Sequence, residues 1–310
     1  MGNTAIRKTG VKYRSVGRPS TGILPAPPFM ATTIFILAAL SAVLPGCVPA
    51  RPERAAPEVE VPPAPVERKG SVIFLSYPVD YRIDSIDLFL FSDSGTQPLE
   101  LHRRTCLKDT FCISSAPGDK EAVLIANCPY AFNLAAVPNL DALEQLRFSF
   151  SEDNPQAPLM SAVLNFEAGG TAKAVLQPLM CRVVIESVSN MMSGYLRLED
   201  PSAFLSGMNP EAELLRSGGF AAIMPQTDTV RAALPCDIGI FTQYPGTELF
   251  CYPNDPGDAS PASPPTLLHL EGACGGDFRR LSFVLPPLHR GCTVRAAISF
   301  DETNSSVSFR

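Results

Sequence analysis

The sequence predicts a mainly β protein built from antiparallel β-sandwich domains. Short runs rich in Val, Ile, Leu and Phe recur along the chain, separated by Gly, Pro, Asn and Asp residues, which is the pattern of strands joined by turns. Within residues 181–188, Arg182 and Glu186 share one face and apolar side chains share the other, as expected of a strand with one face in water. Only residues 141–148 have a good helical pattern, which argues against alternating strand–helix units.

In the first half of the chain, β-strands are expected wherever a short apolar run ends at a turn. The expected strands are residues 71–77, 85–92, 99–102, 121–126 and 161–166. Asp93-Ser94-Gly95 is a turn signal after the second strand. The expected helix, residues 141–148, begins with Asp141 followed three residues later by Glu144, an arrangement similar to a capping box.

The second half repeats this pattern after an apolar stretch, residues 172–188, that Pro178 interrupts. We place a domain boundary there, which divides the folded part into residues 70–178 and 179–310. Further strands are expected at residues 195–198, 220–224, 229–234, 239–241, 248–252, 266–271, 278–285, 293–300 and 305–309. Five prolines in residues 253–265 indicate a surface loop, and a short helix is expected around residues 211–216.

An export signal is predicted at the start of the chain. Residues 1–46 carry five basic residues and no acidic one, and residues 29–44 are uncharged and mostly apolar. As a helix, this apolar run would extend roughly 24 Å, less than the roughly 30 Å of a bilayer core. Leu44-Pro45-Gly46-Cys47 follows as a lipobox, so residues 1–46 are predicted to be a lipoprotein signal peptide and Cys47 to be acylated. The alternatives are an ordinary signal peptide with a chance cysteine, or a plain membrane anchor.

Residues 47–69 are predicted to be the lipidated cysteine and a proline-rich linker. Six of the 22 residues after Cys47 are proline. Because proline has a restricted φ and no N–H group, such a segment favours extended polyproline conformations. At about 3.1 Å per residue, the linker would reach roughly 70 Å from the lipid. The protein is therefore expected to lie outside the cytoplasm and to be held at a membrane by the lipid on Cys47.

The charge of the chain argues against nucleic acid as a partner. The formal net charge is −6, and removing the five basic residues of positions 1–46 makes it −11. An acidic protein of this kind is repelled by phosphate backbones. No segment after the signal peptide is long and apolar enough to be expected to span a membrane.

Eight cysteines remain when Cys47 is set aside. An even number permits disulfides in an exported protein, but eight cysteines allow on the order of 100 connectivities. The pairs nearest in sequence are Cys106 with Cys112, Cys236 with Cys251, and Cys274 with Cys292. Unpaired buried cysteines are the alternative, because a chain of this length can form a core without disulfides.

Signatures of catalysis and metal binding are absent from the sequence. There is no G-x-S-x-G motif, no H-E-x-x-H motif and no phosphate-binding glycine loop. The histidines, His102, His269 and His289, are scattered, and His289 with Cys292 would supply only two ligands of a metal site. We therefore expect a protein that is not an enzyme and that holds no metal or cofactor. The absence of tryptophan also weakens a glycan-binding interpretation, because sugar-binding surfaces usually rely on aromatic side chains.

The motifs after the linker follow a recognisable order. Residues 83–91 read IDSIDLFLF and precede the Asp-Ser-Gly turn, AVLIANCP occupies residues 122–129, and the expected helix, PLMS and the CRVVI strand at 181–185 come next. This order resembles the fimbrillin-associated anchor lipoproteins of Bacteroidales-type (type V) fimbriae, best over about residues 70–190. The resemblance implies two transthyretin-like β-sandwich domains in series, with one short helix in the first.

The same resemblance implies a lipoprotein of the cell outer membrane whose partners are fimbrial subunits. Such a protein holds a surface filament at its base and limits the filament's length, and the subunits join when a strand of one fills a groove in the next. Which sandwich would accept or donate a strand is left open, and residues 305–310 are alternatively the last strand of their own sheet. The alternative function is a surface lipoprotein that binds a glycan or a host protein.

Overall fold

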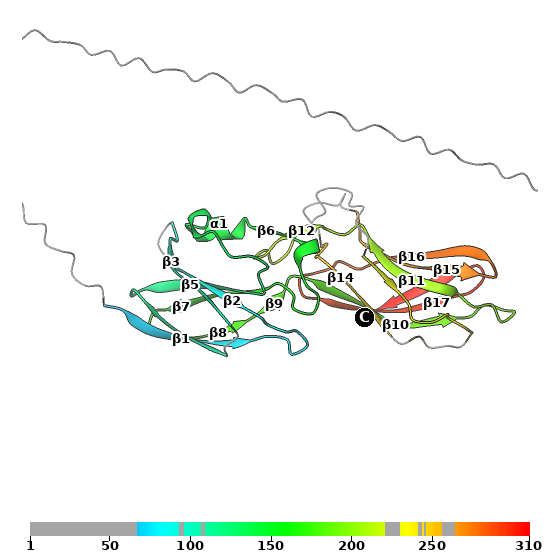
Figure 1. Cartoon of the computed structure of the whole chain (residues 1–310), viewed down its shortest axis with the longest axis horizontal. Coiled ribbons are helices and arrows are strands. Elements are labelled where there is room, and N and C mark those ends of the chain that lie inside the picture. Colours follow the sequence, from blue (N-terminus) through cyan, green and yellow to red (C-terminus); the bar gives the residue numbers. More distant parts are fainter. Residues whose placement is uncertain are drawn as a thin grey trace, which may run out of the picture. The chain divides into compact units, whose positions relative to one another are not determined.

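The computed structural model describes residues 67–92, 96–106, 109–220, 230–240, 244, 246–255 and 264–310. These residues belong to one compact unit, Pro63–Arg310. Two β-sandwiches follow one another along this unit, and the described residues include a single α-helix (Figure 1). The fold class predicted from the sequence is thereby confirmed.

The first sandwich consists of a five-stranded and a three-stranded sheet. The five-stranded sheet has the order β3 (Leu99–Thr105), β2 (Ile86–Ser92), β5 (Asp119–Ala126), β7 (Met160–Glu167) and β9 (Gln177–Pro178). The three-stranded sheet has the order β4 (Thr110–Ser115), β1 (Lys69–Ser76) and β8 (Thr171–Val175). All neighbouring strands are antiparallel except β1 and β8, which run parallel.

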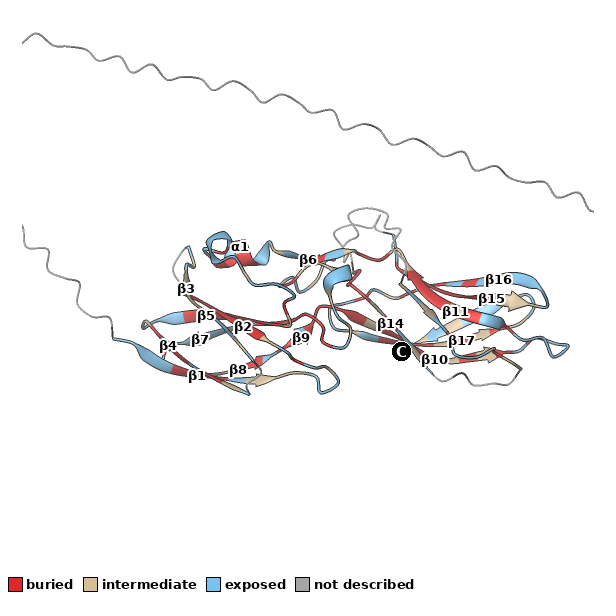
Figure 2. Cartoon of the chain, in the orientation of Figure 1, coloured by how far each residue is buried: buried red, intermediate tan, exposed pale blue. Residues whose placement is uncertain are grey.

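Strand β2 is buried on both faces, which explains the apolar run Leu88–Phe91 at its centre. Leu88 and Leu90 pack between the two sheets, whereas Phe89 and Phe91 pack into a second core cluster on the other side of the five-stranded sheet. Because successive side chains of a strand point to opposite faces, a strand covered on both sides is apolar at most positions, and its one buried charge, Asp87, is paired with His102 at 3.0 Å. Figure 2 shows the resulting buried residues along the inner strands.

The α-helix, α1 (Leu140–Glu144), begins one residue before the predicted range and ends earlier. Its N-cap is Asn139, whose side chain accepts a hydrogen bond of 3.0 Å from the Ala142 N–H. The predicted capping-box start at Asp141 is therefore wrong, because Asp141 already lies in the first turn. Two short 3₁₀ helices flank this region, η1 (Leu134–Ala136) and η2 (Phe150–Glu152).

The chain after α1 forms a strand instead of continuing the helix. This strand, β6 (Arg147–Ser149), pairs antiparallel with β12 (Glu211–Glu213). The helix predicted around residues 211–216 is therefore wrong. Ala212 and Leu214 are buried in the same core cluster as Phe148, and a spacing of two residues between buried side chains suits a strand.

The second sandwich consists of two four-stranded sheets. One has the order β14 (Thr247–Cys251), β10 (Cys181–Asn190), β17 (Thr293–Phe300) and β18 (Ser305–Phe309), and the other has the order β13 (Val230–Ala233), β11 (Glu199–Ser206), β15 (Leu267–Cys274) and β16 (Asp277–Val284). The pairs are antiparallel except β10 and β17, which run parallel. A single apolar cluster fills the space between the two sheets.

Most of the predicted strands are observed, with a few differences. Strands β4, β8 and β11 were not expected. Residues 195–198 form a turn and an isolated bridge instead of a strand, and the described residues of the expected strand 239–241 show only an isolated bridge at Ile240. Gly194 and Tyr195 have φ values of +69° and +58°, which belong to turns and not to strands. Strand β18 is the last strand of its own sheet. The predicted turn at residues 93–95, residues 221–224 and most of the 253–265 loop lie outside the described residues.

Between the two sandwiches, β9 ends at Pro178 and β10 begins at Cys181. The boundary at residues 178 and 179 stays a prediction of where two domains would separate. Within the described part of the chain, no helix combines the length and the hydropathy that a bilayer-spanning helix needs.

Candidate functional site

The site residue predicted from the sequence, Cys47, lies outside the described residues, as do the signal peptide and linker residues 47–66. Lipidation of Cys47 therefore stays a prediction. The described residues offer two other candidates, a polar sheet face and a cleft, both in the second sandwich.

The first candidate is the outer face of the sheet β13-β11-β15-β16. Alternate residues of these strands, such as Leu205 and Leu270, point into the core of the sandwich. Their neighbours point outward and form what we call the outer polar face. It comprises Ser202, Phe204, Ser206, Arg231, His269, Glu271, Arg280 and Ser282.

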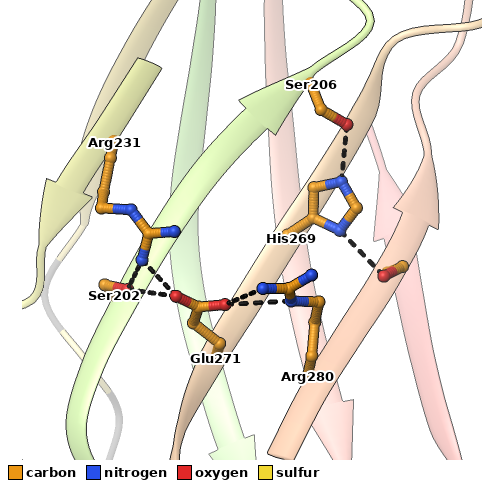
Figure 3. A network of polar contacts seen from close by, with 7 residues as sticks. Ser202, Ser206, Arg231, His269, Glu271 and Arg280 are labelled. Carbon is orange, nitrogen blue, oxygen red and sulfur yellow. Dashed lines mark hydrogen bonds and ion pairs between the residues drawn. The ribbon is translucent and has the colours of Figure 1, made fainter. Parts of the chain in front are cut away.

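The strand register arranges the outer polar face in two rows across the sheet. One row runs through Arg231, Phe204, His269 and Ser282, and the other through Ser202, Glu271 and Arg280. Residues directly opposite each other on neighbouring strands are close enough for their side chains to interact. Direct pairing accounts for the contacts of His269 with Ser282 and of Glu271 with Ser202 and Arg280. Diagonal neighbours add Ser206 to His269 and Arg231 to Glu271 (Figure 3).

His269 lies at the centre of the first row (Figure 3). Its Nε2 is 2.7 Å from the Ser206 Oγ, and its Nδ1 is 2.8 Å from the Ser282 Oγ. Its ring stacks on Phe204 with 4.4 Å between the ring centres. Burial lowers the pKa of His269, and the positive charge of Arg280 lowers it further. The imidazole is therefore neutral at neutral pH, with one nitrogen donating a hydrogen bond and the other accepting one.

Glu271 lies at the centre of the second row and is paired with two arginines. It forms ion pairs with Arg231 and, at 2.9 Å, with Arg280. Burial alone would raise the pKa of Glu271, but the hydrogen bonds and charges of the two arginines lower it below its usual value. Both guanidinium groups also lie over the Phe204 ring, at 4.4 Å and 5.3 Å from its centre. The arginines thereby cover Phe204 and Glu271, which are only 6% and 8% exposed.

The outer polar face lacks the carboxylate that a hydrolase triad needs. The pair of Ser206 and His269 has the spacing of a nucleophile and its base, but Ser282 occupies the second imidazole nitrogen, where a triad has a carboxylate. In the part of the chain that the structure describes, no group of three or more His, Cys, Asp or Glu residues could hold a metal ion. The half-exposed Arg231 and Arg280 are the groups that a partner would contact.

The second candidate is a cleft of about 580 Å³ beside the turn between β10 and β11. It is lined by Met192, Tyr195, the ion pair of Arg197 and Asp237, and neighbouring backbone. Tyr195 is 92% exposed. Its φ is positive, a backbone conformation that bulky residues rarely adopt. The volume of the cleft is within the range of small-molecule binding sites.

The other predicted or considered residues are distributed over the fold. His102 bonds to Asp87 at 3.0 Å and His289 bonds to Asp255 at 2.6 Å, so the three histidines lie at separate places. All eight cysteines of the described residues are free thiols, and none of the three pairs nearest in sequence is joined. Sequence reasoning missed the outer polar face. The sequence signal that could have revealed this face is the alternation of polar with apolar residues in β11, β15 and β16.

Neither the family models nor the curated proteins match this chain. Several solved structures resemble it. A proposed cell adhesion protein from Parabacteroides distasonis has a TM-score of 0.59 at 13% identity, covering 78% of this chain and 96% of its own. The tip fimbrial protein Mfa3 from Porphyromonas gingivalis, in a C-terminally truncated form, has a TM-score of 0.52 at 12% identity, covering 79% and 99%. A fimbrial assembly protein from Parabacteroides distasonis has a TM-score of 0.51 at 10% identity, covering 79% and 95%.

This likeness shows the fold. The chain has the two-sandwich architecture of fimbrial and proposed adhesion proteins of these bacteria, along nearly the whole length of each. The resemblance noted in the sequence is thereby confirmed at the level of the fold. The anchor role in particular is not singled out by the likeness, since a tip protein and an assembly protein are both among the similar structures.

Proposed function

We propose that this protein is a lipid-anchored component of a surface fimbria, which attaches or assembles the filament at the cell outer membrane. The observation that carries the proposal is the likeness of fold to fimbrial proteins over 95–99% of their chains. The lipobox that ends at Cys47 adds a membrane attachment. The partners would be fimbrial subunits on one side and the membrane on the other.

The lipid on Cys47 would attach the protein to the membrane. Each acyl CH₂ group buried in a membrane contributes about 0.8 kcal/mol, and stable attachment requires more than one chain. A cysteine with several acyl chains would therefore stay in the membrane. The linker that follows would hold the sandwiches at a distance of up to roughly 70 Å, enough to reach a filament base.

We further propose that one of the sandwiches joins a filament subunit by strand exchange. Each sheet ends in edge strands, and an edge strand exposes backbone groups that can pair with an added strand. Strand β18 is such an edge, and only β17 pairs with it among the described residues. Main-chain hydrogen bonds would supply the affinity, and alternate side chains would set the register.

The test is deletion of the gene, followed by complementation with the wild-type protein or with Cys47→Ala. Filament subunits are counted by immunoblot on washed cells and in the medium, and filament length is measured by electron microscopy. We expect the deletion and C47A strains to release filaments into the medium or to carry abnormally long ones. The wild-type gene should restore cell-bound filaments.

Cells that carry the wild-type protein also provide a test of strand exchange. A filament subunit purified together with this protein should stay bound in cold detergent and separate on heating, because a row of main-chain hydrogen bonds resists detergent. Cell-bound filaments of normal length in the deletion strain would contradict the anchoring role and leave the surface-binding alternative. A subunit that separates in cold detergent would contradict strand exchange alone.

A further inference from the structure

Three cysteines lie side by side at one end of a sheet in the second sandwich, two of them on strands and Cys292 directly before β17. Cys181 begins β10 and is directly opposite Cys251 of β14. On the other side of β10, Arg182 is level with Thr293 of β17, so Cys292 comes level with Cys181. All three side chains pack against the same apolar cluster, and they form what we call the thiol row.

The spacing of the thiol row suits a covalent link. Neighbouring strands lie about 4.7–4.9 Å apart, which sets the spacing of Cys181 and Cys292 across the parallel pair β10–β17. Opposite residues of an antiparallel pair, such as Cys181 and Cys251, have Cα atoms about 4.5–5.5 Å apart. A disulfide needs a Cα separation of about 4.4–6.8 Å with the side chains pointing to the same side. Cys181 is in the middle of the row, so it can join either neighbour but not both.

The contacts around Cys181 favour Cys292 as its partner. The Cys181 Sγ donates a hydrogen bond of 3.0 Å to the His289 carbonyl, and the Cys292 N–H donates one of 3.1 Å to the same oxygen. The Arg182 N–H also donates to the Cys292 carbonyl at 2.9 Å. These bonds hold the two cysteines together, and each of the two thiols shifts the pKa of the other.

Exposure and pKa also make Cys292 the most reactive of the three thiols. Cys181 and Cys251 are fully buried, whereas Cys292 is partly exposed. The neighbouring Cys181 thiol lowers the pKa of Cys292, while burial raises the pKa of Cys251. Because the thiolate is the nucleophile, an oxidant from the solvent reaches and reacts with Cys292 first.

We propose that Cys181 and Cys292 form a disulfide in the exported protein and that Cys251 stays a thiol. The inference rests on the proposed function only in requiring export to an oxidising compartment. The oxidant is a disulfide, either a small-molecule one or that of a thiol oxidoreductase. The cross-link joins β10 to β17 directly after the connection from the first sandwich.

The reaction is two successive thiol–disulfide exchanges. The Cys292 thiolate attacks one sulfur of the oxidant, and the other sulfur leaves as a thiolate and takes a proton. The Cys181 sulfur then attacks the Cys292 sulfur and expels the second thiolate of the oxidant, which takes the proton that Cys181 gives up. The two cysteines lose two electrons and two protons, and the oxidant is reduced to two thiols.

The experiment uses the mature protein isolated from cell membranes and the same protein reduced and then oxidised with oxidised glutathione. Each sample is unfolded in iodoacetamide, digested and examined by mass spectrometry, with and without prior reduction. We expect a peptide pair linked through Cys181 and Cys292, and alkylated Cys251, in both samples. Reduction should also lower the melting temperature by about 5 °C or more, because a link between residues far apart in the chain restricts the unfolded state.

Serine variants provide the controls. Cys181→Ser and Cys292→Ser should abolish the linked peptide and the effect of reduction on the melting temperature, whereas Cys251→Ser should retain both. Alkylation of Cys181 and Cys292 without prior reduction, in either sample, would overturn the proposal. A link between Cys181 and Cys251 would overturn it as well.

Failure of the proposed function would look different. A protein that carries the Cys181–Cys292 link but no lipid supports the disulfide and overturns membrane attachment through Cys47. A lipid-bearing protein with alkylated thiols overturns the disulfide and leaves the anchor intact.

Discussion

At the scale of single residues, Asp153 is a carboxyl whose environment makes the stability of the fold depend on pH. It accepts hydrogen bonds from the Leu159 N–H at 2.8 Å and from the Tyr252 hydroxyl at 3.3 Å. Burial nevertheless raises its pKa to about 6, compared with about 3.9 in an unfolded chain. The folded state therefore holds the proton more tightly than the unfolded state does.

The sign of the effect follows from this difference. The stability that Asp153 contributes is fully present below pH 3.9 or so and is lost as the pH rises through about 6. We expect this residue alone to lower the free energy of unfolding by about 2 kcal/mol between pH 4 and pH 7. For Asp153→Asn, the free energy of unfolding measured with urea between pH 4 and pH 7 should lack this decrease. A variant with the wild-type pH dependence would contradict the assignment.

At the scale of elements, helix α1 depends on its cap because it is only five residues long. The Asn139 side chain satisfies the Ala142 N–H, one of the N–H groups that have no partner within a helix. Asn139→Ala should therefore reduce the free energy of unfolding by about 1 kcal/mol. Denaturant unfolding at neutral pH measures this difference.

The matched control for Asn139 is Asp141, which the sequence wrongly indicated as the cap. Asp141 lies in the first turn, where a negative charge interacts only with the helix dipole. Asp141→Ala should therefore have a smaller effect than Asn139→Ala. Equal losses, or a larger one at Asp141, would contradict the capping that the structure shows.

At the scale of the whole molecule, Arg290 connects the second sandwich to the first. Its guanidinium donates to the Ser161 Oγ at 2.6 Å, to the Gln177 carbonyl at 2.9 Å and to the Leu214 carbonyl. No carboxylate among the described residues pairs with it, and burial lowers its pKa to about 10. Arg290 thus acts as a positively charged donor that binds several acceptors of the other sandwich and of the segment after β12.

Replacement of Arg290 by Met should weaken the connection between the sandwiches. Two of the three acceptors belong to the buried residues Ser161 and Leu214, so we expect a loss of about 3 kcal/mol. Calorimetry should show a lower melting temperature and a transition that broadens or divides. The control is Arg295→Met, which removes an exposed ion pair with Glu186 and should cost less than about 1 kcal/mol. Similar losses in both variants would contradict the role of Arg290.

The sequence predicted correctly those strands whose pattern depends only on residues that are neighbours in the chain. The alternation in 181–188 and the apolar run in 85–92 both marked true strands, because side-chain period and burial are local properties of a strand. Local patterns failed at residues 211–216 and at the end of the helix. There β6 and β12 pair with each other, and each strand alone is too short to show its period.

The sequence by itself therefore determined the class of fold, most of the strands and the prediction of a lipid attachment at Cys47. The tertiary structure decided which strands pair, including the parallel pairs β1–β8 and β10–β17. It thereby also decided that Cys181 lies beside Cys292 and that Glu271 lies between two arginines. The physical reason is that a strand's period is set by its own backbone, whereas its partners are chosen by burial and hydrogen bonding among segments that are distant in the sequence.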